Sequence, residues 1–260
     1  MNDAAKRIRR NILNIAAASG HGHIPTCFSV VEALLAIYKT MRHDPKNPGW
    51  SERDIFILSK GHAALGHYAV LAELGYFDVA EVYGFGTYGT RFGCHADRLK
   101  VPGVEVSTGS LGHGIGVAVG VALGLKVKKS DRRIYAVVGD GEANEGTVWE
   151  AIMVATDQAL DNLTIIYDDN KSQQRCLAIL NPAERLTAFG CDVRVAPGHD
   201  IDALTAALVR RPGKVNAVVA QAQKGFGCRS LADNIYEWHR KSPDAAMLAQ
   251  LMEELDAWPL

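Results

Sequence analysis

The sequence predicts an α/β fold in which a mostly parallel sheet carries helices on both faces. Short runs rich in β-branched and apolar residues alternate along the chain with longer segments of helical spacing. The clearest unit is a strand at 133–138, a helix at 144–160 and a second strand at 163–167. A unit of these lengths favours parallel strands joined by a right-handed crossover. We therefore expect a layered domain with about five or more strands.

The same alternation accounts for the other elements. The segment 6–18 has isoleucines at helical spacing near one face. Ser29 followed by Glu32 has the pattern of a capping box, which predicts a helix from 29 to 38. The remaining expected elements are a strand at 54–58, a helix at 63–74, a buried, glycine-rich helix at 113–127, a strand at 189–195, a helix at 202–210, a strand at 215–220 and a helix at 242–255.

The length and composition favour one domain over residues 1–260. The chain has 260 residues, of which 48% are hydrophobic and 22% charged, and a chain this long buries roughly 70–75% of its unfolded surface. Repeats, low-complexity tracts and linkers are absent from the sequence. The segment 84–106 lacks a regular pattern, and loops of this length in compact domains tend to be functional.

The charge pattern argues against nucleic-acid and membrane partners. The formal net charge is −1, so we expect no basic face for nucleic acid and no attraction to a membrane surface. No run of about 18 apolar residues predicts a membrane span, and the segment 1–10 lacks the apolar core of a signal peptide.

The cysteines point to a reducing compartment. They are odd in number and include no C-x-x-C pair, which argues against a disulfide framework or a zinc cluster and predicts a cytoplasmic protein. The five are Cys27, Cys94, Cys176, Cys191 and Cys228.

Two polar signals follow two neighbouring strands and together predict a metal–diphosphate site. Gly139 and Gly141 allow a tight turn before a helix start that suits phosphate. Asp140 between them would repel a diphosphate unless a divalent cation lies between the two. Asp140, the amide oxygen of Asn170, a nearby backbone carbonyl and phosphate oxygens would supply the oxygen octahedron that Mg²⁺ prefers.

Other interpretations of this motif fit less well. A dinucleotide fingerprint requires a third glycine where Asn144 stands, a P-loop requires Gly-Lys-Ser/Thr, and an EF-hand requires a late glutamate. The plain alternative is a strand-to-helix turn capped by Asp140. Asn170 at the end of the next strand favours the metal site over that turn.

Five of the nine histidines lie in glycine-rich segments where strands end. Taken singly, each fits a surface or core position. Near a phosphate site, a histidine can donate to phosphate, steer a hydroxyl or move a proton near neutral pH. The five are His23, His62, His95, His113 and His239.

These motifs resemble those of one family. Three segments are similar to the corresponding sequences of transketolases. They are Gly-Asp-Gly-Glu-Ala-Asn-Glu-Gly-Thr-Val-Trp-Glu-Ala (139–151), 160–163 and 168–171. The resemblance extends from about 7 to 243 and matches the N-terminal half of these enzymes. It implies a thiamine diphosphate-binding fold, of which this half binds the diphosphate.

The resemblance also implies a cofactor site. Mg²⁺ would be held by Asp140, Asn170 and the carbonyl of Ser172. The diphosphate and the length of thiamine diphosphate would be bound by His62, Gly109, Ser110, Leu111, Gly139, Asp140, Gly141 and Asn170.

Catalytic roles are implied in the same way. His23, His95 and His239 resemble histidines that line the substrate channel, stabilise alkoxides and move protons, and His239 could also touch the diphosphate. Glu145 resembles an acid in the network that links the two cofactor sites of a dimer. The implied reaction transfers a two-carbon ketol unit from a ketose, free or phosphorylated, to an aldose.

The resemblance predicts a missing partner. The glutamate that activates the aminopyrimidine ring belongs to the second half of transketolases, and this sequence ends at Leu260. We expect the N-terminal subunit of a split transketolase, completed by a separate C-terminal subunit in an α₂β₂ heterotetramer. The end of the chain favours a natural subunit, with truncation of a longer protein as the alternative.

Two departures leave the substrate open. Ile24-Pro25-Thr26-Cys27 replace the usual Gly-Gly-Ser or Pro-Gly after His23, and Arg240 replaces a glycine after His239. Arg240 could pair with an anionic substrate or be solvated, and Asp168 could be a plain strand cap. The rival hypotheses are a pathway-specific acyl or ketol transferase and a non-catalytic α/β scaffold.

Overall fold

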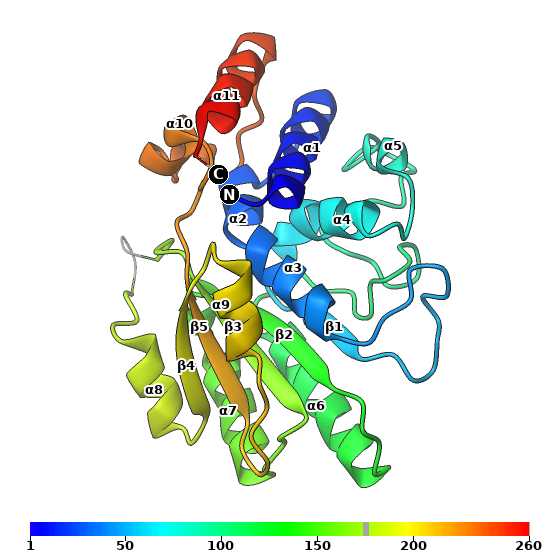
Figure 1. Cartoon of the computed structure of the whole chain (residues 1–260), viewed down its shortest axis with the longest axis vertical. Coiled ribbons are helices and arrows are strands. Elements are labelled where there is room, and N and C mark those ends of the chain that lie inside the picture. Colours follow the sequence, from blue (N-terminus) through cyan, green and yellow to red (C-terminus); the bar gives the residue numbers. More distant parts are fainter. Residues whose placement is uncertain (174–176, 260) are drawn as a thin grey trace.

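Five parallel strands form the centre of the computed structural model, which describes residues 1–173 and 177–259 (Figure 1). Their order is β1-β2-β3-β5-β4, and every neighbouring pair is parallel. The expected strands are therefore confirmed, each within three residues at both ends. Their bounds are β1 Ile55–Leu58, β2 Ile134–Gly139, β3 Leu163–Asp169, β4 Asp192–Pro197 and β5 Asn216–Gln221.

Helices cover both faces of the sheet, which confirms the predicted fold class. Successive side chains of β2 enter opposite cores, with Tyr135 and Val137 in one and Ala136 and Val138 in the other. The first core is shared by α1 (Asp3–Ser19), α2 (Ile24–Ser29), α3 (Val31–Thr40), α4 (Ala64–Glu73), α5 (Val79–Val82), α9 (Ile201–Ala207), α10 (Arg229–Asp233) and α11 (Ala245–Ala257). The second is shared by α6 (His113–Val127), α7 (Gly146–Asp157) and α8 (Pro182–Ala188).

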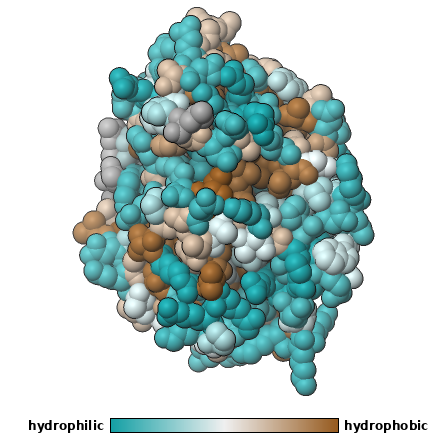
Figure 2. Space-filling view, viewed as in Figure 1, coloured by the Kyte–Doolittle hydropathy of each residue, from teal (hydrophilic) through white to brown (hydrophobic). Residues whose placement is uncertain are grey.

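The surface agrees with this layered burial. The face shown in Figure 2 is mostly hydrophilic, and hydrophobic residues reach it in separate patches. No helix among the described residues is both long and apolar enough to cross a membrane. The segment 84–106, all of it described, is irregular as expected. Four cysteines are free thiols, namely Cys27, Cys94, Cys191 and Cys228, and Cys176 lies outside the described residues.

The predicted capping box is wrong. Ser29 is the last residue of α2, and its hydroxyl donates to the carboxylate of Asp168, 2.8 Å away. Glu32 is buried and binds Arg9 instead of capping α3, which begins after Val30 without a side-chain cap. Partners distant in the sequence therefore override the local pattern. The long helix at 144–160 is also shortened to α7, because Glu142–Asn144 form a separate 3₁₀ turn.

A fully buried arginine joins several segments of the first layer. Arg9 of α1 donates to both carboxylate oxygens of Glu32, at 2.6 and 2.8 Å, and to the carbonyls of Phe28 and Phe226. The ring of His199 lies 3.0 Å from the same carboxylate and stacks on Phe226. Burial would raise the pKa of Glu32, but the charge of Arg9 and the bond from His199 bring it to about 2. This cluster fixes α1 against α3 and the loop before α9.

We expect Arg9→Met to lower the free energy of unfolding by about 3–5 kcal/mol, because it leaves the buried carboxylate of Glu32 without its cation. The control is Lys39→Met, which removes an exposed ion pair with Asp202 and should cost about 1 kcal/mol or less. Urea unfolding measures both. Equal losses in the two variants would contradict a structural role for the Arg9 cluster.

Candidate active site

A cavity of about 640 Å³ opens at the carboxyl ends of β1, β2 and β3. Parallel strands bring these ends to one edge, where ligands gather in α/β sheets. The start of α2, the 3₁₀ turn Glu237–His239 and the long irregular segment also reach it. It is lined by His23, Lys60, His62, His95, Gly109, Leu111, Gly139, Asp140, Gly141, Glu142, Asn144, Ser172, Gln173, Leu177, His239 and Arg240.

Most of the residues chosen from the sequence meet in this cavity. The structure brings together His23, His62, His95, Gly109, Leu111, Gly139, Asp140, Gly141, Ser172 and His239. Asn170 is buried and bonded to Ser172 of the lining. Ser110, His113 and Glu145 are exposed and do not line it. The site also contains four polar residues that the sequence does not predict, because their burial depends on the fold and nothing local distinguishes them from surface polar residues. They are Lys60, Glu142, Gln173 and Lys224.

The predicted metal ligands lie at neighbouring strand ends. Asp140 follows β2 and donates its backbone N–H to the carbonyl of Asp168 in β3, 3.2 Å away. The amide oxygen of Asn170 accepts from the backbone N–H of Ser172 at 3.1 Å. Burial and the charge of Asp168 raise the pKa of Asp140, a shift that a bound cation would oppose.

The donor chemistry fits Mg²⁺. Carboxylate, amide and carbonyl oxygens are the ligands this ion prefers. No group of three or more His, Cys, Asp or Glu residues within 1–173 and 177–259 could hold a metal, so a cation here would also depend on amide, carbonyl and ligand oxygens. Across the same residues, the second carboxylate oxygen of Asp168 is buried without a hydrogen-bond partner. This edge thus keeps a buried carboxylate oxygen that a bound cation could use.

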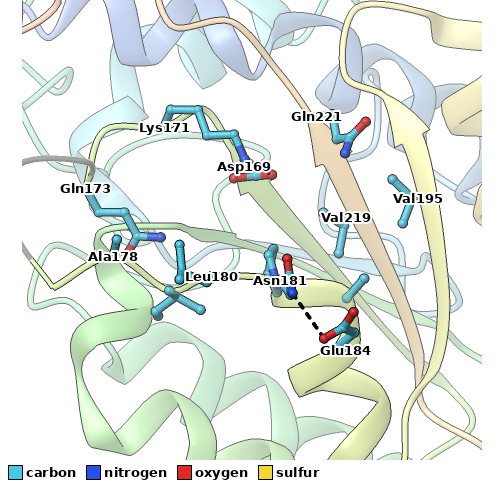
Figure 3. A pocket seen from close by; sticks show the side chains of 13 residues that line it. Asp169, Lys171, Gln173, Ala178, Leu180, Asn181, Glu184, Val195, Val219 and Gln221 are labelled. Carbon is cyan, nitrogen blue, oxygen red and sulfur yellow. Dashed lines mark hydrogen bonds and ion pairs between the residues drawn. The ribbon is translucent and has the colours of Figure 1, made fainter.

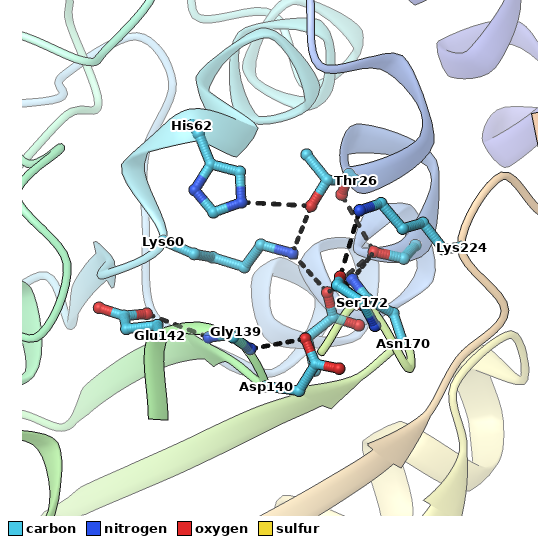
Figure 4. Close-up of polar contacts among 12 residues, drawn as sticks. Thr26, Lys60, His62, Gly139, Asp140, Glu142, Asn170, Ser172 and Lys224 are labelled. Atoms are coloured by element: carbon cyan, nitrogen blue, oxygen red, sulfur yellow. Dashed lines mark hydrogen bonds and ion pairs between the residues drawn. The ribbon is translucent and has the colours of Figure 1, made fainter. Parts of the chain in front are cut away.

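A buried ion pair crosses the floor of the site (Figure 4). The ammonium of Lys60 lies 2.5 Å from the carboxylate of Asp168 and donates to the hydroxyl of Thr26 at 2.8 Å. The same carboxylate oxygen accepts from Ser29 and from the amide nitrogen of Asn170, each at 2.8 Å. Asp168 is therefore part of β3 and orients Asn170, rather than being a plain strand cap.

The carboxylate of Glu142, in the cavity wall, is hydrogen-bonded to residues of three segments. It accepts from the hydroxyl of Ser59 at 2.6 Å and from the backbone N–H groups of Gly112 and Gly139 at 2.9 and 3.0 Å. Burial raises the pKa of Glu142. These bonds hold the segment at Gly109 beside the Gly-Asp-Gly turn, where a bound cofactor would contact both.

Three histidine rings form a cluster over the ion pair. The ring centroids of His23 and His62 are 5.6 Å apart, and those of His23 and His239 are 5.2 Å apart. Burial, then the charge of His239, lowers the pKa of His23 to about 4, and burial, then Lys60, lowers that of His62 to about 2. Both rings are therefore neutral at pH 7, and each has one nitrogen that donates and one that accepts a hydrogen bond.

Lys224 adds a further buried cation after β5. Its ammonium lies 3.2 Å from the hydroxyl of Ser172 and 3.4 Å from the ring of His239. Burial, then the charge of Lys60, lowers the pKa of Lys224 to about 8. The site thus combines oxygen ligands for a cation with cations and neutral histidines for an anion.

A second cavity of about 410 Å³ lies beside the first, near the ends of β3, β4 and β5 (Figure 3). Its wall includes Val195, Val219 and the ion pair of Lys171 with Asp169. Gln173 lines both cavities. Among residues 1–173 and 177–259, the two linings share no other residue.

The fold and the first cavity define a parallel α/β domain with a ligand-sized cavity at the carboxyl edge of its sheet. The family described as "Transketolase, thiamine diphosphate binding domain" matches residues 1–228. The chain is 39% identical to a protein of Actinobacillus succinogenes that is named as one subunit of an apulose-4-phosphate transketolase, over 96% of this chain and 94% of that protein. It is 38% identical to the 6-deoxy-6-sulfo-D-fructose transketolase subunit SqwG of a Clostridium species, over 86% and 84%.

Full-length transketolases match over part of their length. Human transketolase is 35% identical over 98% of this chain and 42% of its own. The crystal structure of transketolase from Campylobacter jejuni superposes with a TM-score of 0.88 at 26% identity, over 100% of this chain and 44% of that one. The chain therefore belongs to the transketolase family, as the motifs predicted, and corresponds to its N-terminal part. It is a component of a transketolase-type transferase.

We expect Lys60→Met to lower the free energy of unfolding by about 3–5 kcal/mol, because Asp168 is left as a buried, uncompensated charge. The double variant Lys60→Met/Asp168→Asn should regain part of this loss. The control Lys241→Met removes an exposed pair with Glu237 and should cost about 1 kcal/mol or less. Urea unfolding measures the three free energies. A loss for Lys60→Met no larger than that for Lys241→Met, or no recovery in the double variant, would contradict a buried ion pair.

His23 should titrate near pH 4 in the folded chain, as measured by NMR of its ring. Since this pKa lies below the ordinary 6.5, the unfolded state takes up the proton first as pH falls. The contribution of His23 to stability is thus lost from about pH 6.5 down to about 4. His239→Gln should move the titration towards 6.5 by removing a neighbouring charge. A midpoint already near 6.5 in the native chain would contradict the buried cluster.

Proposed function

We propose that the chain is the N-terminal subunit of a thiamine diphosphate- and Mg²⁺-dependent transketolase. It would transfer a two-carbon ketol unit from a ketose to an aldose, together with a separate C-terminal subunit. The observation that carries this proposal is the convergence of the metal-type ligands at the ends of β2 and β3 with His23, His62 and His239 around one cavity.

The residues at the strand ends would hold the cofactor. Asp140, the amide oxygen of Asn170 and the carbonyl of Ser172 would bind Mg²⁺, and His62 with the backbone near Gly141 would contact the diphosphate. When bound, thiamine diphosphate supplies the carbanion chemistry that the protein itself lacks. The share of this chain is to orient the cofactor and to exclude water from the buried end of the cavity.

The histidines would act on the sugar. His23, His95 and His239 line the cavity, and a neutral ring can donate a hydrogen bond to a developing alkoxide or take a proton from a hydroxyl. The low pKa of His23, about 4, keeps this ring neutral at pH 7, so it can donate or accept a hydrogen bond. Burial and Lys224 also lower the pKa of His239.

The need for a partner is supported by the lengths of the relatives. Two relatives named as subunits are covered over 94% and 84% of their length, whereas human transketolase is covered over 42%. The partner would supply the pyrimidine-binding half and its activating glutamate in an α₂β₂ assembly. Glu145 is exposed at the start of α7, as a link between cofactor sites of two protomers would require.

A second candidate function keeps the cofactor but changes the substrate. It is favoured by α2, where Thr26 bonds to Lys60 and lies 3.4 Å from the ring of His62. This unusual segment therefore bears directly on the histidine cluster. The two relatives carry names with a sugar phosphate and a sulfonated sugar, so we propose a dedicated ketose as substrate, with a panel of ketoses as its test.

We expect the purified chain to bind thiamine diphosphate with Mg²⁺ but to transfer no ketol unit until the partner subunit is added. Asp140→Ala should weaken cofactor binding, followed by protein fluorescence, by at least about 100-fold, the upper end of the range for groups that merely support a metal ligand. Asp157→Ala, at an exposed end of α7, is the control and should bind normally.

Two outcomes would contradict this proposal. Ketol transfer by the chain without a partner would rule out the split enzyme. An Asp140→Ala complex with unchanged activity would favour a non-catalytic, scaffolding subunit.

A further inference from the structure

Arg240 is an exposed guanidinium in the wall of the active-site cavity. Within residues 1–173 and 177–259, no hydrogen bond or ion pair reaches its side chain. The next residue differs, because Lys241 lies 2.7 Å from the carboxylate of Glu237 and 4.8 Å over the ring of Trp238. The chain thus neutralises one cation of this segment and leaves the neighbouring one free.

Among the described residues of the cavity wall, no carboxylate pairs with Arg240. The acidic residues of this wall, Asp140 and Glu142, are each 1% exposed and bonded to backbone N–H groups. The nearby rings are neutral or cationic: burial is the main reason for the low pKa of His23 and His239, and the charge of Arg240 lowers both further. The outer cavity therefore holds uncompensated positive charge, which attracts an anion.

The position of Arg240 separates it from the cations of the inner site. Lys60 and Lys224 are 1% and 3% exposed and lie against Asp168 and Ser172, where the metal and the diphosphate would bind. Arg240 is solvent-exposed and directly follows His239. An anionic group bound by Arg240 would therefore lie at the solvent-exposed end of a ligand whose other end reaches the inner site.

We propose that Arg240 binds a tetrahedral oxyanion, phosphate or sulfonate, carried by the sugar substrate, and so selects charged over uncharged ketoses. This inference rests on the proposed ketol-transfer function. A guanidinium binds such a group through two parallel N–H···O bonds, which an ammonium cannot reproduce. Because the residue is exposed, its contribution should weaken as ionic strength rises.

The test compares the native complex with complexes that carry Arg240→Gln, Arg240→Lys or Lys241→Gln. The donors are D-fructose 6-phosphate, 6-deoxy-6-sulfo-D-fructose and D-fructose. Arg240→Gln should raise KM for the better charged donor about tenfold or more, the size expected for a lost charged hydrogen bond, with kcat within about twofold. Its kcat/KM for D-fructose should not change, Arg240→Lys should recover part of the loss, and Lys241→Gln should match the native complex.

The phosphorylated and the sulfonated donors are tested separately. The donor whose KM rises in the Arg240→Gln complex carries the oxyanion that Arg240 binds. A loss of equal size for charged and uncharged donors would overturn the inference. So would weaker binding of thiamine diphosphate by the Arg240→Gln chain, since Arg240 would then serve the cofactor. A native complex that transfers no ketol unit would overturn the proposed function itself, which is a different result.

Discussion

The buried pair of Lys60 and Asp168 is the interaction on which the site depends. Lys60 follows β1 and Asp168 lies in β3, so the pair spans the intervening end of β2. The side chain of Lys60 passes over Gly139, where an added Cβ would lie 3.6 Å from it. Three strand ends are thereby held in one arrangement, and Asn170 is oriented by the same carboxylate. Removing either charge would leave the other buried without a partner.

The strands, and the position of Asp140 and Asn170 at neighbouring strand ends, could be predicted because their signals are local. Apolar runs mark β1 to β5, and Gly-Asp-Gly with Asn170 follows two of them. The capping box at Ser29 failed for the opposite reason, since its hydroxyl is bound by Asp168, far along the chain. The roles of Lys60 and Lys224 could not be predicted from the sequence, because only the folded chain shows that these two side chains are buried. Local chemistry is visible in a sequence, but the burial of a charge is not.

The site is assembled from two kinds of structure. Groups suited to the cofactor lie at the ends of hydrogen-bonded strands, which rigid packing holds in place. Groups suited to the sugar, among them His23, His95 and Arg240, come from a short helix, a long irregular segment and a 3₁₀ turn. Such segments tolerate change more readily than strands do. Under the proposed function, substitutions in these segments would alter substrate preference and leave the strand ends in place.

The lowered pKa values of His23 and His62, about 4 and about 2, determine which side chains of the cavity carry charge. At neutral pH these rings contribute no charge, so the attraction of anions falls to Lys60, Lys224 and Arg240. The rings keep a free lone pair at the same time. The fixed charge of the cavity at neutral pH therefore comes from its amino and guanidinium groups, and a modest fall in pH would leave both rings neutral.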